Sequence, residues 1–427
     1  MRDENALYWV WLAEKFGVAS KCFPSFVEKY PDPYDVYRLT EEELEYTDGM
    51  TDALKARLAD KSLDGAYSIL KYCREHKVGI IGYGSAQYPQ RLRTIENPPV
   101  VLYCLGKLPN MNDGLCLGIV GTRKMSEYGK QTAYKISYEL AAANAVVVSG
   151  MALGIDGVSA CGAISAGGKT VAVLGSGIAK VYPRQHEKLM KIIAQHGAVI
   201  TEYPPFEAPN GRNFPVRNRI ISGLCQGVIV IEGARGSGSL ITASKALSQG
   251  RELFALPGKV NESNSDGPNE LIRNGANVVL SAEDIIGHYD FLYHDVINYG
   301  KFYKAKRKSD IDESALEKMG VCSSCYRKQI AIVADEGGNT QAPSTPSVEQ
   351  TVTAEPEKTA ELDSGVYESL DKLSKQIFDS LPKDKSFTPD EVSTASGIAI
   401  SEVITSLTML EISGLVTSVP GGMFKRA

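Results

Sequence analysis

Short apolar runs recur along the middle of the chain, separated by stretches in which apolar residues follow helical spacing. Unbroken runs of Val, Ile, Leu and Ala are typical of strands that are buried on both faces. Such strands alternating with helices predict the α/β class, with an extended Rossmann-like, doubly wound and mostly parallel sheet. The runs cover residues 115–120, 145–148, 170–174, 198–200, 228–231, 253–256 and 278–280.

The start of the chain has a helical pattern. Apolar residues recur at helical spacing in residues 7–12 and 53–58, and residues 40–43 (Thr-Glu-Glu-Glu) match the capping box that opens helices. We therefore predict a small helical domain of the SAM or helix-hairpin-helix type over residues 1–80. The Rossmann-like domain is then expected over residues 81–300.

The end of the chain is predicted to hold a linker and a second small domain. Residues 301–365 begin as a basic helical stretch and continue as a Gly-, Pro-, Ser-, Thr- and Glu-rich segment, which predicts a disordered linker because so little apolar surface cannot offset the ordering entropy. Residues 366–427 predict three helices and a hairpin, the pattern of a winged helix. The helices are expected at 366–378, from 388 onward and at 401–412, and the hairpin at 415–424.

The formal net charge of −5 argues against a nucleic-acid binder unless the distribution of the charges along the chain is considered. Residues 335–363 hold seven acids and one base, a net charge of −6, so the rest of the chain carries a net charge of +1. A near-neutral body leaves room for a local basic groove, because the arrangement of charges matters more than the pI.

The cysteines predict the compartment. All eight are scattered and several lie inside apolar runs, which is typical of reduced thiols in a cytosol. The start of the chain does not match a signal peptide and no stretch approaches the roughly 18 apolar residues of a membrane span, so we expect a cytoplasmic protein without membrane contact. Cys322 and Cys325 form half of a zinc site, with His288 and His294 as conceivable partners, but this spacing matches no zinc finger and we predict no metal or other cofactor.

Polar and glycine-rich loops follow the predicted strands. Parallel strands place their carboxyl ends on one rim of the sheet, where doubly wound sheets bind their ligands. Arg212, Arg217 and Arg219 lie within eight residues that contain no acid, beside Phe214 and directly before an apolar helix predicted at 220–225. Solvated arginines at a helix start are the plainer alternative. Guanidinium groups next to glycine-rich loops, however, suit the phosphates of a polyanion.

Nucleotide chemistry fits the loops less well. The segment that begins at Gly175 has Lys180 where a dinucleotide-binding motif has its third glycine, and residues 233–239 lack the lysine of a P-loop. Asp156 and Glu232 end two strands and could form a general acid–base pair. No histidine lies in either loop, and we expect Asp156 to cap the helix that follows it.

These residues together resemble the DNA-processing protein A family, also called DprA or Smf. The motifs occur in the family's order over roughly residues 85–290, and the flanking helical and winged-helix parts match more loosely. They comprise Gly121-Thr122-Arg123, residues 149–156 (Ser-Gly-Met-Ala-Leu-Gly-Ile-Asp), residues 166–175, Tyr182-Pro183-Arg184, residues 214–219 (Phe-Pro-Val-Arg-Asn-Arg), residues 237–243, Pro257-Gly258 and residues 269–272.

The resemblance implies a protein that binds single-stranded DNA, forms a homodimer and helps load the recombinase RecA onto incoming strands in natural transformation and recombination. It implies no catalysis. One departure is that Ala160 is followed by Cys161 where the family usually has His, and we expect this cysteine to pack in a buried helix.

The residues that we expect to contact DNA combine loop amides and hydroxyls with arginine charge, and Tyr182 or Phe214 is placed to stack a base. Arg123 and Arg184 carry over from positions that match the family's motifs, and the other arginines rest on local reasoning. The full set is Gly121, Thr122, Arg123, Ser149, Gly150, Arg184, Arg212, Phe214, Arg217, Asn218, Arg219, Ser237, Gly238 and Ser239.

The competing class is an enzyme. The core also resembles the lysine-decarboxylase-like nucleotide phosphoribohydrolases, but residues 233–242 lack the catalytic glutamate of their glycine-rich loop. In the winged helix, the predicted recognition helix contains Glu402 and Glu411 and no base, which disfavours duplex binding and favours a protein contact.

Overall fold

The computed structural model describes residues 3–47, 50–321, 372–382, 385–398, 400–412, 415–419 and 423–426. The chain divides into two compact units, Met1–Thr340 and Gln341–Ala427. The predicted disordered part of the linker, together with Cys322 and Cys325, lies outside the described residues. None of the described helices has the length and apolar character that crossing a membrane requires.

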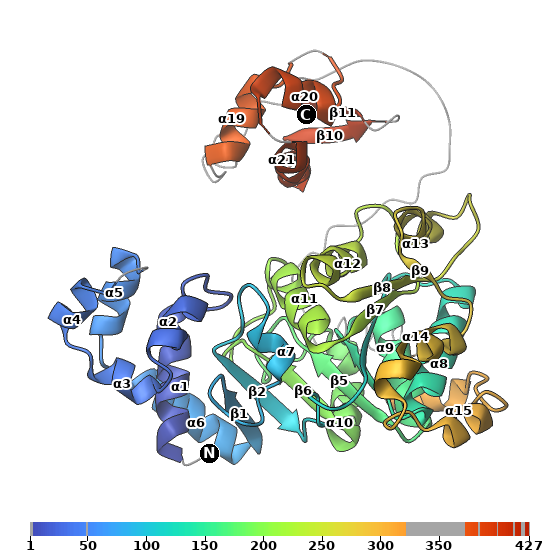
Figure 1. Cartoon of the computed structure of the whole chain (residues 1–427), viewed down its shortest axis with the longest axis horizontal. Helices are drawn as coiled ribbons and strands as arrows, with labels where there is room; N and C mark the ends of the chain where they lie inside the picture. The colour runs from blue at the N-terminus through green and yellow to red at the C-terminus, as the bar shows by residue number, and fades with distance from the viewer. Residues whose placement is uncertain are drawn as a thin grey trace, which may run out of the picture. The chain divides into compact units, whose positions relative to one another are not determined.

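A twisted sheet forms the centre of the first unit (Figure 1). Its nine strands, counted over the described part of the chain, follow the order β1-β2-β6-β5-β4-β3-β7-β8-β9. Every neighbouring pair among the seven strands β3 to β9 is parallel. The predicted runs are confirmed as β3 (Cys116–Val120), β4 (Val146–Ser149), β5 (Lys169–Val173), β6 (Ala198–Thr201), β7 (Gly227–Val230), β8 (Glu252–Ala255) and β9 (Asn277–Val278).

Two further strands extend one edge of the sheet and were not predicted. β1 (Val78–Gly82) pairs antiparallel with β2 (Val101–Gly106), which in turn pairs antiparallel with β6. Glycines interrupt the apolar pattern of β1, and β2 mixes Tyr and Cys into its run, so neither strand has the unbroken Val and Ile pattern of the parallel strands.

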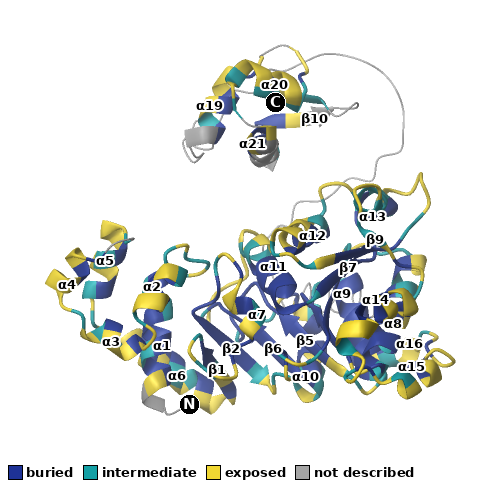
Figure 2. Ribbon diagram, viewed as in Figure 1, coloured by how far each residue is buried: buried dark blue, intermediate teal, exposed yellow. Residues whose placement is uncertain are grey.

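Helices cover both faces of the sheet, as the unbroken apolar runs predict (Figure 2). Leu117 and Ile119 of β3 belong to one buried apolar cluster, whereas Cys116 and Val120 of the same strand belong to another. The doubly wound, mostly parallel architecture is thereby confirmed. The helices of this region are α7 (Gln90–Arg93), α8 (Glu127–Ala142), α9 (Ile155–Ser165), α10 (Glu187–His196), α11 (Asn213–Leu224), α12 (Gly238–Ser248), α13 (Ser263–Arg273), α14 (Ala282–Tyr293), α15 (Tyr299–Ala305) and α16 (Glu313–Met319), with a short 3₁₀ helix at Arg184–His186.

The N-terminal helices pack against the antiparallel edge of the sheet. The Thr40 capping box is present, with Glu43 reaching back to the Thr40 amide. Trp9 and Trp11 are buried in the same apolar cluster as Tyr103 of β2, so these helices share a core with the sheet. They are α1 (Asp3–Phe16), α2 (Phe23–Lys29), α3 (Pro33–Arg38), α4 (Glu41–Glu45), α5 (Asp52–Ala59) and α6 (Asp64–Glu75).

The second unit is a winged helix, as predicted. Thr388 opens its middle helix with a capping box, and Phe387 bridges to Phe424 beside the hairpin. Arg426 lies 3.9 Å from the centre of the Phe378 ring, so this cation packs on its own domain. The described elements are α19 (Lys372–Ser380), α20 (Pro389–Ser396), α21 (Ile400–Ile412), β10 (Val416–Val419) and β11 (Met423–Arg426).

Candidate nucleic-acid interface

A pocket of about 650 Å³ opens at the carboxyl ends of the parallel strands. It lies where the strand order reverses around β3, which is the position at which doubly wound sheets bind ligands. Loops after β3, β4, β5 and β7 contribute to it, together with α11 and α12. Of the predicted residues, Gly121, Thr122, Arg123, Phe214, Arg217, Asn218, Ser237, Gly238 and Ser239 line this pocket.

Arg217 projects from α11 into the floor of the pocket. Its Nη1 donates to the carbonyl of Gly150 at 2.8 Å and to that of Val173, at the ends of β4 and β5. The side chain is 4% exposed, and burial lowers the pKa of Arg217 to about 10 while the Asp156 carboxylate opposes that shift. Arg217 therefore keeps its positive charge at neutral pH and fixes two strand ends with it.

Two guanidinium groups flank the Phe214 ring. Arg123 lies 5.6 Å and Arg217 5.8 Å from its centre, which is cation–π range. Tyr182 is 39% exposed and its ring lies 5.2 Å from that of Phe214. The pocket thus combines positive charge with two aromatic faces.

The serine-rich loop after β7 leads into α12. Ser237 and Ser239 share a hydrogen bond of 2.8 Å, and Asn218 donates to the carbonyl of Gly238. Gly238 is the first residue of α12, and no side chain caps its free amides. The amino end of a helix favours anions, so these amides suit a phosphate group.

Asp156 and Glu232 are bound to backbone amides. Asp156 accepts from Gly150 at 3.1 Å and Ala152 at 3.4 Å, and burial raises the pKa of this carboxyl although Arg217 lowers it. Glu232 accepts from the amide and hydroxyl of Ser126 at the start of α8. Both carboxylates hold the loops of the pocket in place. The expected capping role of Asp156 is wrong, because Gly154 is the N-cap of α9 and no side chain caps that helix, whereas Asp156 lies inside α9 and binds amides of the preceding loop.

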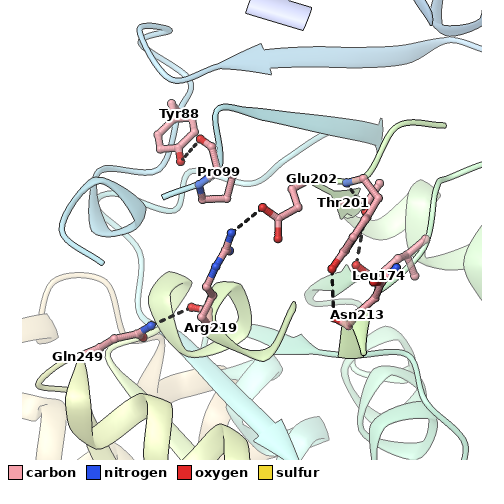
Figure 3. Close-up of polar contacts among 9 residues, drawn as sticks. Tyr88, Pro99, Leu174, Thr201, Glu202, Asn213, Arg219 and Gln249 are labelled. Carbon is pink, nitrogen blue, oxygen red and sulfur yellow. Dashed lines mark hydrogen bonds and ion pairs between the residues drawn. The ribbon is translucent and has the colours of Figure 1, made fainter. Parts of the chain in front are cut away.

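Arg219 is placed differently from the prediction. The sequence suggested that the helix begins at Ile220, but α11 begins at Asn213, so both arginines are helical. Residues two positions apart lie about 200° apart around a helix, so these side chains point to opposite sides. Arg219 forms an ion pair with Glu202, with 2.5 Å between Nη2 and Oε2. Figure 3 shows this pair, and because both residues are buried, Arg219 contributes no charge to the pocket.

Four other predicted residues do not line the pocket. Ser149 is buried and its hydroxyl donates to the carbonyl of Ile119, while the carbonyl of Gly150 holds Arg217. Arg184 and Arg212 are exposed and lie next to lining residues in the sequence. Neither side chain is brought into the pocket itself.

Sequence reasoning missed some of the lining residues. Ile221 lies one helical turn after Arg217, and Thr242 one turn after Gly238. This i,i+4 spacing on helices that begin at the rim was the available signal. Gly177, in the segment that was compared with a dinucleotide-binding motif, is a glycine for a packing reason. A Cβ there would lie 2.2 Å from the carbonyl oxygen of Pro204.

Cys161 lies inside α9 and is fully buried. Burial raises the pKa of its thiol well above its usual value. The residue is not among those that line the pocket, in line with the packing role expected for it.

The structure is a doubly wound α/β fold of the Rossmann-like class, with a pocket at the carboxyl ends of its parallel strands. A model of the family described as DNA recombination-mediator protein A matches residues 79–290, and a DprA winged helix domain model matches residues 360–422. The chain belongs to the DNA-processing protein A (DprA/Smf) family.

Individual relatives agree with this assignment. The chain is 42% identical to DNA processing protein DprA of Bacillus subtilis over 55% of this chain and 80% of the relative. It is 32% identical to Protein Smf of Synechocystis over 79% of this chain and 78% of the relative. The X-ray structure of DNA processing protein A from Streptococcus pneumoniae matches with a TM-score of 0.58 and 33% identity, covering 66% of this chain and 97% of that one.

Proposed function

We propose that the pocket binds the phosphate backbone of single-stranded DNA and does not cleave it. The observation that carries this proposal is Arg123, which is exposed beside the free amides of α12 and has no ion-pair partner among the described residues. An exposed guanidinium without an ion pair, next to a helix amino end, suits a phosphate ligand.

The aromatic rings favour a single strand over a duplex. Phe214 and Tyr182 lie beside the positive groups. A base whose own phosphate is bound at those groups can therefore stack on either ring. In a duplex, the faces of the bases are stacked on one another and are not accessible to such rings. We therefore assign the rings to contacts with unpaired bases.

The wider role follows from the family. A recombination mediator that holds single strands would present them to RecA during natural transformation and recombination in the cytoplasm, and this is the role that we propose. A homodimer is part of the proposal, since Val278 in the terminal strand β9 of the sheet and Leu280 directly after it are exposed. The acidic winged helix is assigned a protein contact and not a duplex contact.

The test is the salt dependence of oligonucleotide binding, measured by fluorescence anisotropy. Arg123→Ala should weaken binding and lower the slope of log K against log salt by roughly 0.7, the value for one lost phosphate contact on a single strand. Arg57→Ala removes an exposed arginine from α5 and serves as the matched control. Unchanged affinity and slope in Arg123→Ala would contradict the proposal.

A further inference from the structure

A second hollow, of about 480 Å³, lies at the opposite ends of the same parallel strands. It is bounded by the residues that precede β4, by the turn between α9 and β5, and by α15. Five cations line it and no carboxylate does: Lys169, Lys301, Lys304, Arg307 and Lys308. The hollow is thus at the amino ends of the strands, whereas Arg123 follows the carboxyl end of β3, and α15 lies beyond the residues 79–290 that match the family model.

The five cations are free of partners. Among the described residues, none of their side chains has a hydrogen bond or an ion pair. Lys306, on the same segment, differs because it forms an ion pair with Glu283 and is not among the lining residues. The protein thus neutralises the cation that faces away from the hollow and leaves the ones around it unpaired.

The segment that carries these cations is held firmly. Phe302 and Ala305 of α15 are buried, and the amide of Asn298 donates to the carbonyl of Ala143 beyond the end of α8. Ser309, directly after the basic run, is buried and donates to Glu139 of α8. Four of the five cations are therefore displayed from a fixed support, which costs less ordering entropy on binding than a free tail would.

Helix dipoles do not account for this cluster. α8 and α9 both end at the hollow, and cations are favoured near helix carboxyl ends. The terminal carbonyls are already occupied, however, since those of Glu139, Leu140 and Ala141 accept from the amides of residues 143–145. Five like charges around one cavity repel each other, and a bound polyanion would relieve that repulsion.

The geometry points to a second contact site for the phosphate backbone of a nucleic-acid strand, formed by the cations of α15 and Lys169. This inference rests on the proposed function, because it adds to the length of strand that the protein holds. The two sites lie at the two ends of α8, whose 16 residues span about 24 Å. Tyr138, which also lines the hollow, supplies an aromatic face beside the cations.

The experiment compares oligonucleotides of about 4 and about 20 nucleotides, because only the longer one reaches from one site to the other. The full chain carries the triple change Lys301→Gln, Lys304→Gln and Lys308→Gln. Binding of the long strand should weaken at least tenfold, and the slope of log K against log salt should fall by about 2, for three lost contacts. Binding of the short strand should stay within twofold of the wild type.

Two comparisons make the outcome specific. Lys306→Gln removes one charge from the same segment but not from the hollow, and should leave the binding of both strands unchanged. Arg123→Ala should weaken the binding of both strands, so failure of the rim pocket and failure of the second site are distinguishable. The inference is overturned if the triple variant binds the long strand like the wild type. It is also overturned if the triple variant loses only the binding of an added peptide of residues 335–363, because the hollow would then bind this acidic segment of the chain and not a nucleic-acid strand.

Discussion

Positive charge is held in different ways at the two ends of the parallel sheet. At the carboxyl ends, Arg217 is buried, donates hydrogen bonds to two backbone carbonyls and has the Asp156 carboxylate as its counter-charge. At the amino ends, Lys301 and Lys304 extend from the surface of a short helix and contact no acid among the described residues. The first charge is part of the fold, whereas the second can be removed without changing it, and this difference is measurable.

The largest expected effect is on stability at the rim. Arg217→Met removes two charge-assisted hydrogen bonds and leaves Asp156 buried without its counter-charge, so the free energy of unfolding should fall by about 4 kcal/mol. Urea denaturation measures this. Lys304→Gln, the matched change at the other end, should shift stability by no more than about 0.5 kcal/mol. Equal effects of the two substitutions would remove the distinction between the two ends.

The ion pair of Arg219 with Glu202 tests the contribution of a second buried arginine of α11 to stability. Arg219→Leu leaves the Glu202 carboxylate buried and unpaired, which should lower the free energy of unfolding by about 3 kcal/mol. The double variant with Glu202→Leu should return to within about 1 kcal/mol of the wild type, because an apolar pair needs no compensation. If the double variant is less stable than Arg219→Leu, the pair is not the cause.

A third effect on stability, smaller than those of the two arginines, depends on pH. His186 is buried beside the loop after β4 and lies 2.9 Å from the carbonyl of Met151, and burial lowers the pKa of His186 to about 4. The unfolded chain takes up a proton near pH 6.5 while the folded chain does not, so stability present at pH 7 is lost as the pH falls, by about 2 kcal/mol at pH 5. His186→Gln should flatten this part of the profile in denaturation measurements. A wild-type profile that is already flat between pH 7 and 5 would show that the histidine does not titrate in this way.

The parallel core was predictable because burial on both faces leaves unbroken apolar runs. The strands β1 and β2 were not, because antiparallel strands at an edge of the sheet carry glycines and mixed residues that give no such run. The winged helix was recognisable from its helix starts, and the capping boxes at Thr40 and Thr388 are local signals that the tertiary structure retains.

The candidate site was predictable in outline only. Loops that follow parallel strands must meet on one rim, so Gly121 and Ser237 could be brought together from the sequence. The orientation of Arg217 and Arg219 depends on where α11 begins. The helix begins at Asn213, seven residues before the predicted start, so both arginines are helical and only Arg217 faces the rim while Arg219 faces the core. The basic hollow combines α15 with the turn before Lys169, and no local pattern links these two segments.

The position of Phe214 between Arg123 and Arg217 limits how the pocket can change during evolution. Arg217 supports strand ends, so a substitution there alters the fold together with the ligand. Arg123 lies near the same ring but is exposed, and its side chain has no hydrogen bond or ion pair among the described residues. Variation in strand affinity among related proteins should therefore arise at Arg123 and its exposed neighbours, while Arg217 changes only in company with Asp156.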